Sequence, residues 1–170
     1  MIGAELGRGA GILAIDHDHS FCVTGAMARA DALCAARGVR LTPVRRRVLE
    51  LIWRSHAPVG AYAMLDVLRL EGFNAQPPTV YRALEFLSEQ GLIHRLESRN
   101  AFIGCPSPDH PHQALYLICT HCGTVEERED SPDLAKALTA LADKTGFRIA
   151  GRTLELTGLC RGCSATQSAA

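Results

Sequence analysis

The chain has 170 residues, of which 47% are hydrophobic and 21% charged, and its formal net charge is zero. This composition is typical of a globular protein of one or two small domains and argues against a disordered or fibrous chain. No apolar run reaches the roughly 18 residues that a membrane span needs, and the short run before Asp16 does not resemble a signal peptide. We therefore expect no membrane partner.

Seven cysteines without a secretory signal indicate a cytoplasmic protein, because paired cysteines in a reducing compartment usually bind metal rather than each other. The zero net charge also hides an asymmetry. Residues 27–103 hold 11 Lys and Arg against 7 Asp and Glu, whereas residues 104–170 hold 6 against 8. A basic part followed by an acidic part is typical of a nucleic-acid-binding domain joined to a second unit, although so small an excess also arises by chance.

Residues 1–25 show no regular period, and their alternating glycines favour a flexible arm. His17, His19 and Cys22 in this arm offer metal ligands, but such a cluster at a terminus is more often a solvated tail.

Residues 26–103 predict a winged helix-turn-helix domain. Four helices are expected in it, over 26–37, 43–52, 61–70 and 79–90. Thr42 is a natural N-cap for the second, since Pro43 follows it at the first helical position. The pattern then changes to alternation, which predicts a hairpin over 93–103 directly after the fourth helix.

The fourth helix is the expected DNA-reading element. Thr79, Tyr81 and Arg82 face outward near its start, and Arg binds guanine bidentately while Tyr packs against a thymine methyl group. In a simpler interpretation, Tyr81 contacts no DNA and only covers the third helix. Arg45, in a run of three arginines, is expected either on a solvated face or against DNA phosphates.

Residues 104–112 contain three prolines and predict a hinge. Residues 113–170 mix strand and helix patterns: strands at 115–118, 124–127, 147–149 and 153–156, and a helix that begins at Pro132 after the cap Ser131 and ends at Gly146. So small a domain has little core of its own, so we expect a metal ion or a partner subunit to stabilise it.

Two Cys-x2-Cys pairs are the strongest motif in the chain: Cys119 with Cys122, and Cys160 with Cys163. Two such turns supply the four thiolates of a tetrahedral structural zinc site. The alternatives are a redox pair or unlinked core cysteines; a redox pair normally opens a helix after a strand, which neither pair is clearly expected to do. The 37 residues between the pairs place a helix and two strands inside the loop that zinc would close.

A second set of metal-binding residue types comprises His94, Cys105, His112 and Glu127. These residues extend from the hairpin across the hinge into the second domain, so a metal bound by all four would fix how the two domains lie. A ligand that prefers one orientation shifts the equilibrium toward it. One thiolate with two imidazoles and a carboxylate favours zinc over iron or manganese.

The sequence contains none of the phosphate-binding glycine loops, nucleophile elbows or deaminase motifs that indicate an enzyme with a small-molecule substrate. We expect the chain not to be an enzyme.

In combination, several motifs resemble the ferric uptake regulator family. They are Leu41-Thr42-Pro43-x-Arg45, Pro78-Thr79-Val80-Tyr81-Arg82-x-Leu84, Gly91-Leu92-Ile93-His94 and the two cysteine pairs. Within the family, the segment 81–91 and the presence of Cys105 are most similar to the zinc uptake regulator branch. The resemblance covers residues 26–163.

The resemblance implies an α+β protein: an N-terminal winged helix-turn-helix domain (26–103), a hinge (104–112) and a small C-terminal α/β dimerisation domain (113–170). It implies two Zn²⁺ ions per chain, a structural one on the paired cysteines and a regulatory one on His94, Cys105, His112 and Glu127. His110 or Glu126 could replace its neighbour as a ligand. The implied function is a zinc-responsive repressor whose zinc-loaded homodimer binds double-stranded operator DNA of zinc-uptake genes; an iron or peroxide sensor is the alternative.

Overall fold

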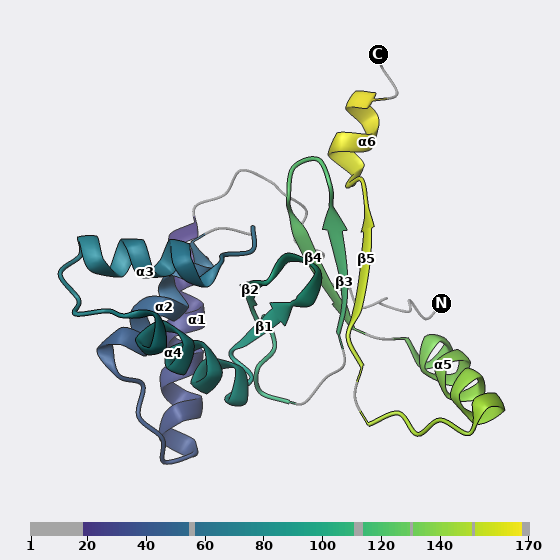
Figure 1. Cartoon of the computed structure of the whole chain (residues 1–170), viewed down its shortest axis with the longest axis horizontal. Helices are drawn as coiled ribbons and strands as arrows, with labels where there is room; N and C mark the ends of the chain where they lie inside the picture. Colours follow the sequence, from purple (N-terminus) through teal and green to yellow (C-terminus); the bar gives the residue numbers. More distant parts are fainter. Residues whose placement is uncertain (1–18, 55–56, 111–113, 130, 151, 168–170) are drawn as a thin grey trace, which may run out of the picture.

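A computed structural model describes residues 19–54, 57–110, 114–129, 131–150 and 152–167. Figure 1 shows a cluster of helices on one side, a three-stranded sheet with an outlying helix on the other, and a small hairpin between them. Within these described segments, no helix is long and apolar enough to cross a membrane.

The helical cluster is the core of the molecule. Its members are α1 (His19–Ala36), α2 (Pro43–Trp53), α3 (Ala61–Leu70) and α4 (Pro77–Glu89). Thr42 caps α2 as expected, since its side chain accepts from the Arg45 backbone N–H. Gln76 and Thr79 form a reciprocal capping box at the start of α4. The apolar stripes of these helices meet in one buried cluster that includes Val48, Met64, Leu68, Val80 and Leu87.

The hairpin directly after α4 forms the wing. Strand β1 (Ile93–Leu96) pairs antiparallel with β2 (Ala101–Gly104), and a single 3-10 turn, η1 (Glu97–Arg99), connects them. Asn100 turns the chain in the left-handed conformation, which Asn tolerates well. The predicted winged helix-turn-helix fold is therefore confirmed.

The second half is a sheet of strand order β4-β3-β5, made of β3 (Ala114–Cys119), β4 (Val125–Glu129) and β5 (Leu154–Gly158). β3 and β4 are antiparallel, so β4 returns the chain to the end of the sheet where β3 began; after α5 (Pro132–Thr145), β5 starts from that end and lies parallel to β3. A last helix, α6 (Arg161–Gln167), follows β5. The predicted α+β class is thus also confirmed.

A small apolar cluster joins the wing to the sheet. Leu96 and Ile103 of the wing pack against Tyr116 and Ile118 of β3, and all four side chains are buried. The wing therefore packs against the helical core with one face, through Ile93 and Phe102, and against the sheet with its other face.

Three element predictions are corrected. α1 begins at His19 and not at Ala26, so residues 19–25 are helical. The strand expected over 147–149 does not form: Phe147 is 68% exposed and follows the Gly146 C-cap without a strand neighbour. α6 was not expected, because its sequence has no apolar stripe.

Candidate metal centres and nucleic-acid interface

The four paired cysteines converge at one end of the sheet. Cys119 ends β3, Cys122 lies in the turn before β4, and Cys160 and Cys163 flank the start of α6. Their sulfur atoms all lie within 4.8 Å of one another, and none of the chain's seven cysteines, all of which are described, forms a disulfide. The Cys122 and Cys160 sulfurs are 3.8 Å apart. Two thiolates on a tetrahedral zinc, each with a bond of about 2.3 Å, stand about 3.8 Å apart.

The backbone around Cys119 favours its thiolate form, whereas the side-chain hydrogen bond to Cys160, then burial, raises the pKa of Cys163, so that Cys163 must lose a proton to bind a metal. Hydrogen bonds from backbone N–H groups at Cys122 and Cys160 lower the pKa of the Cys119 thiol to about 5, and the Cys160 N–H lies 3.3 Å from the Cys119 sulfur. The turn between the first pair ends at Gly123, whose φ of +77° suits glycine. Hydrogen bonds involving Thr124 lower the pKa of Cys122. A thiolate is the form that binds zinc, so this end of the sheet has suitable chemistry for the ion.

The second cysteine pair differs from the prediction that neither pair opens a helix after a strand. Cys160 directly precedes α6, so this pair does open a helix after a strand. The convergence of all four sulfurs remains the better reason to assign a metal site, because a dithiol redox pair needs only two of them.

A second cluster forms where the wing meets the sheet. It brings together His94 of β1, Cys105 just after β2, and Glu127 of β4, with their ligand atoms within 4.8 Å of one another. The His94 Nε2 and Glu127 Oε2 atoms are 3.7 Å apart. Ligands about 2.0–2.2 Å from one tetrahedral ion stand roughly 3.4 Å apart, so the three donors fit zinc. His112, the fourth expected ligand, lies outside the described residues.

The surroundings of this second cluster orient its donors. Burial, then the nearby Glu127 carboxylate, raises the pKa of the Cys105 thiol to about 12, so metal binding there must displace a proton. The buried ring of Tyr116 lies 5.8 Å from the His94 ring, tilted by 52° to it. Sequence patterns did not indicate Tyr116, because only the strand register places it across from Glu127.

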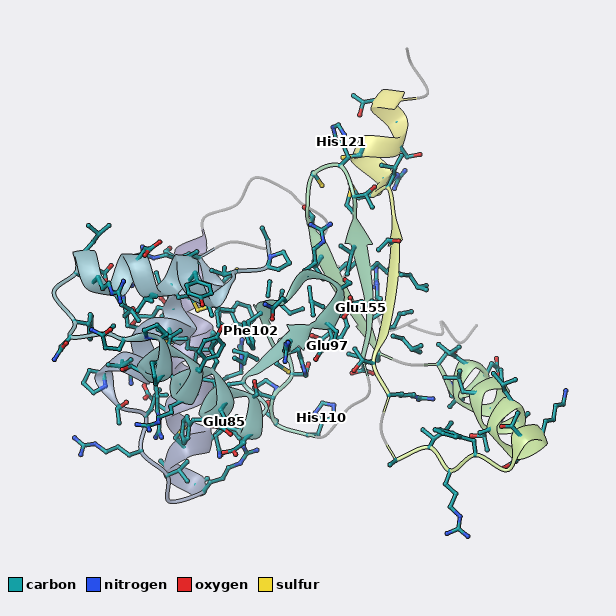
Figure 2. The ribbon with its side chains drawn as sticks, viewed as in Figure 1. Glu85, Glu97, Phe102, His110, His121 and Glu155 are labelled. Carbon is teal, nitrogen blue, oxygen red and sulfur yellow. The ribbon has the colours of Figure 1, made fainter. Side chains whose placement is uncertain are left out.

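The structure distinguishes Glu127 from its neighbour. Successive side chains of β4 point to opposite faces of the sheet, so Glu127 faces the wing while Glu126 lines a hollow on the other face. His110 is exposed, with its Nε2 atom 4.0 Å from a Glu129 oxygen, and is not part of the three-residue cluster. Figure 2 shows His110 on the hinge segment and His121 at the far end of the sheet beside α6.

The outer surface of α4 carries the DNA-reading candidates. Tyr81 and Arg82 are exposed there, as is Glu85, whose outward position Figure 2 shows. Thr79 is less exposed, and its hydroxyl accepts a hydrogen bond from the Gln76 N–H in the capping box. This role at the helix start was not expected for Thr79.

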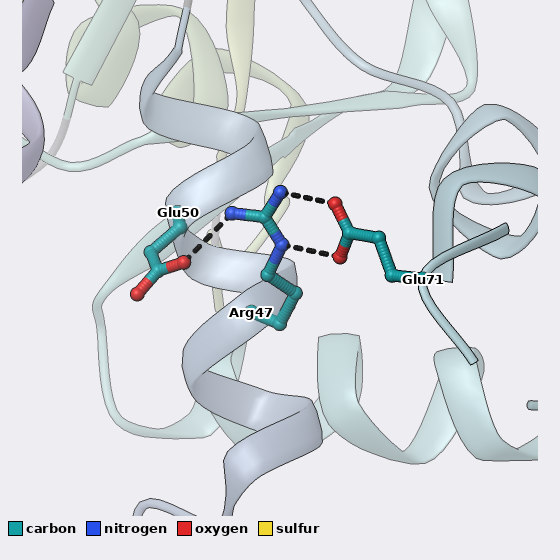
Figure 3. A network of polar contacts seen from close by, with 3 residues as sticks. All are labelled: Arg47, Glu50 and Glu71. Carbon is teal, nitrogen blue, oxygen red and sulfur yellow. Dashed lines mark hydrogen bonds and ion pairs between the residues drawn. The ribbon is translucent and has the colours of Figure 1, made fainter. Parts of the chain in front are cut away.

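The three arginines of α2 all have partners inside the domain. Arg45 lies over the Phe86 ring at 3.6 Å and donates to the Arg40 carbonyl, and Arg46 pairs with Asp31. Arg47 binds both Glu71 carboxylate oxygens and also Glu50, as Figure 3 shows. Hydrogen bonding to Glu71 is the main reason that the Arg47 pKa is raised, and Arg47 in turn lowers that of Glu71. This network ties α2 to the end of α3 and so helps to place the helix-turn-helix.

A winged helix-turn-helix joined to a sheet domain with two clusters of metal-ligand type is the architecture of a metal-binding regulator. The family model of the ferric uptake regulator family matches residues 36–157. The chain belongs to this family.

The similar proteins are regulators. The zinc uptake regulation protein of Escherichia coli (strain K12) is 43% identical over 138 residues, which cover 81% of this chain and 80% of that protein. The peroxide operon regulator of Bacillus subtilis (strain 168) is 33% identical over 75% of this chain and 86% of its own length. A solved structure of a zinc uptake regulator complexed with zinc and DNA has a TM-score of 0.78 and 40% identity, covering 86% of this chain and 97% of that one.

Proposed function

We propose that this chain is a cytoplasmic, zinc-responsive transcriptional repressor, whose zinc-loaded homodimer binds operator DNA of zinc-uptake genes. The observation that carries the proposal is the cluster of His94, Cys105 and Glu127, because its donors come from both the DNA-binding wing and the sheet domain. The 43% identity with a zinc uptake regulation protein supports the same function.

Two zinc ions per chain would have different roles. The structural ion would be held by Cys119, Cys122, Cys160 and Cys163, all in the sheet domain. The regulatory ion would be held by His94, Cys105 and Glu127, with His112 completing a tetrahedral set. Zinc supplies a Lewis-acidic centre that holds all four donors at once. The Cys105 thiolate selects zinc over iron or manganese, which prefer nitrogen and oxygen ligands.

The chain's own residues would turn occupancy of this site into an orientation. His94 lies in β1 of the wing, which packs on α4 through Ile93, so a fixed position of His94 relative to Glu127 also fixes α4. The buried contact of Leu96 with Tyr116 favours that arrangement. Tight DNA binding follows if the arrangement is the one that suits two half-sites about one DNA turn, ~34–36 Å, apart.

Dimerisation through the sheet domain would supply a second copy of α4 to bind the other half-site. Leu117, Leu156 and Leu159 are 37%, 54% and 41% exposed, and they line a hollow of about 700 Å³ on the sheet face away from the wing. Leu141 and Phe147 on and after α5 are exposed as well. Apolar surfaces of this kind usually meet a partner, and a second copy would cover them.

The proposed DNA contacts are Thr79, Tyr81, Arg82 and Arg45. Tyr81 and Arg82 are exposed on the outer face of α4 and suit base edges. Thr79 at the helix start suits a phosphate. Arg45 keeps several guanidinium donors for a phosphate, because only its Nη1 is bonded to the Arg40 carbonyl.

The test measures zinc content and operator binding on the same samples, before and after mild chelation. We expect two zinc ions per chain to fall to one, with DNA binding lost and then restored by zinc but not by iron(II). Cys105→Ser should hold one zinc, remain dimeric and bind DNA independently of added zinc, with a reduced affinity. Cys22→Ser is the matched control for loss of a thiol, because Cys22 lies on α1 outside both clusters.

Two results would contradict the proposal. One is a protein that only ever holds a single, tightly bound zinc and binds DNA regardless of added metal. The other is restoration by iron(II), or loss of binding on peroxide treatment, which would instead support the iron- or peroxide-sensor alternative.

A further inference from the structure

The turn at the tip of the wing is capped by a side chain from the sheet domain. The first N–H groups of any helical turn lack partners inside that turn, and η1 begins at Glu97. The Glu155 carboxylate of β5 accepts hydrogen bonds from the first two of these N–H groups. Its Oε1 lies 2.7 Å from the Glu97 nitrogen, and its Oε2 lies 3.2 Å from the Ser98 nitrogen. Figure 2 labels Glu97 on the wing and Glu155 on the neighbouring strand, near one another.

This contact crosses between the two halves of the protein. Glu155 is paired with Tyr116 in the parallel β3–β5 ladder, and alternation along β5 puts Leu156 on the opposite face, where it lines the hollow. Glu155 therefore projects toward the wing. A carboxylate that accepts two backbone N–H groups forms charge-assisted hydrogen bonds, which are stronger than neutral ones.

The Glu155 cap and the second metal cluster both connect the wing to the sheet, but at different points. His94 and Glu97 are three residues apart along the wing, a distance of roughly 10 Å in a strand. The buried Leu96 lies between them and packs on Tyr116. The wing is thus held at its base by the cluster of His94, Cys105 and Glu127, and at its tip by Glu155.

Two contacts that need one and the same orientation of the wing must favour each other. Any interaction present only in that orientation raises the affinity for every ligand that binds it, and the effect is reciprocal. Arg99 of the same turn also reaches the sheet, where it donates to the Cys119 carbonyl over a longer distance of 3.5 Å.

We propose that Glu155 is a positioning residue that latches the wing onto the sheet and thereby sets the zinc affinity of the regulatory site. The proposal rests on the function proposed above, because it concerns the same site. Glu155 does not belong to either ligand cluster, so it acts on zinc only through the orientation of the wing.

The test compares Glu155→Ala and Glu155→Gln with the wild type in the full chain. Zinc affinity of the exchangeable site is measured by competition with a chelator, and hydrogen exchange is measured at the Glu97 and Ser98 amides. Asp133→Asn is the matched control, because it removes a carboxylate on α5 that is 95% exposed and far from the wing in sequence and structure.

Glu155→Ala should weaken zinc binding roughly tenfold, because it removes both carboxylate acceptors at the wing tip and couplings between two sites are typically about 5–150-fold. It should also speed exchange at the two wing-tip amides. Glu155→Gln should have a zinc affinity and amide exchange rates between those of the wild type and Glu155→Ala, because its single amide oxygen replaces one of the two carboxylate acceptors. Asp133→Asn should match the wild type, and every variant should retain the tightly bound structural zinc.

Faster exchange at the two amides with unchanged zinc affinity would overturn the latch and leave Glu155 as a local cap of η1. Rapid hydrogen exchange at the Glu97 and Ser98 amides of the zinc-loaded wild type would also overturn the proposed latch. A wild type without an exchangeable zinc would instead refute the proposed function, so the two failures are distinguishable.

Discussion

Gly104→Ala is expected to damage both the fold and the regulatory site, because there is no room for a side chain at this position. Gly104 ends β2 and lies against the indole of Trp53 at the end of α2. A Cβ atom there would come within 2.7 Å of the Trp53 Cζ2 atom and still closer to Cε2 and Nε1. Ordinary contacts begin near 3.4 Å, so the ring or the strand must move by roughly one ångström.

The cost follows from this overlap. Overpacking a well-packed site typically costs about 1–3 kcal/mol, and the rigid indole together with a strand paired to Ile93 leaves little freedom to relax. We expect the free energy of unfolding in urea to fall by about 2–3 kcal/mol. Because Cys105 follows directly, a displaced Gly104 also moves a proposed ligand, so zinc at the exchangeable site should bind more weakly.

A double-mutant cycle with Trp53→Ala tests the reasoning. If the clash is the cause, Gly104→Ala should cost less than about 0.5 kcal/mol once the indole is gone, so the two changes are strongly coupled. Gly25→Ala is the control, since its Cβ would meet only the end of the Arg29 side chain at 3.4 Å and alanine favours a helix. An equal cost of Gly104→Ala in both backgrounds would refute the packing argument.

Two further substitutions test the other sites. Cys119→Ser removes the most buried of the four clustered thiols. Because structural zinc contributes roughly 10–16 kcal/mol, the variant should be unfolded by circular dichroism or monomeric by size-exclusion chromatography. A normal dimer would exclude the structural role. Arg82→Ala should weaken operator binding more than binding to random-sequence DNA by about 1–3 kcal/mol; an equal loss on both would reduce Arg82 to a phosphate contact.

Local signals made several helices and the cysteine cluster predictable. The Thr42-Pro43 start of α2 and the Ser131-Pro132 start of α5 are caps that act within one turn, and both occur as expected. The cysteine pairs were informative for a similar reason, because a spacing of two residues alone brings two sulfurs to one ion.

Long-range register could not be predicted in the same way. The sequence of β4, Val125–Glu129, has no alternation of apolar and polar residues, so it gives no reason to prefer Glu127 over Glu126 until the pairing with β3 is known. Glu155 was missed for the same reason, because its partners lie 57 and 58 residues away. The segment 147–149 shows the opposite error: the short alternating run Phe147-Arg148-Ile149 predicts a strand, but a strand needs a neighbour to pair with.

The placement of the two clusters explains why one chain would need two zinc sites. All four paired cysteines lie on β3, the following turn and the β5–α6 junction, so their mutual distances depend only on the fold of the sheet domain. An ion there stabilises that domain equally in every orientation of the wing, and a ligand with equal affinity for two states shifts neither. His94 and Cys105, by contrast, lie on β1 and at the end of β2, which pack on the helical core, whereas Glu127 lies on β4 of the sheet, so these three donors would separate if the wing left the sheet. Under the proposed function, the second site would therefore be the one that couples zinc to the position of α4, while the first would stabilise the sheet domain against which the second site forms.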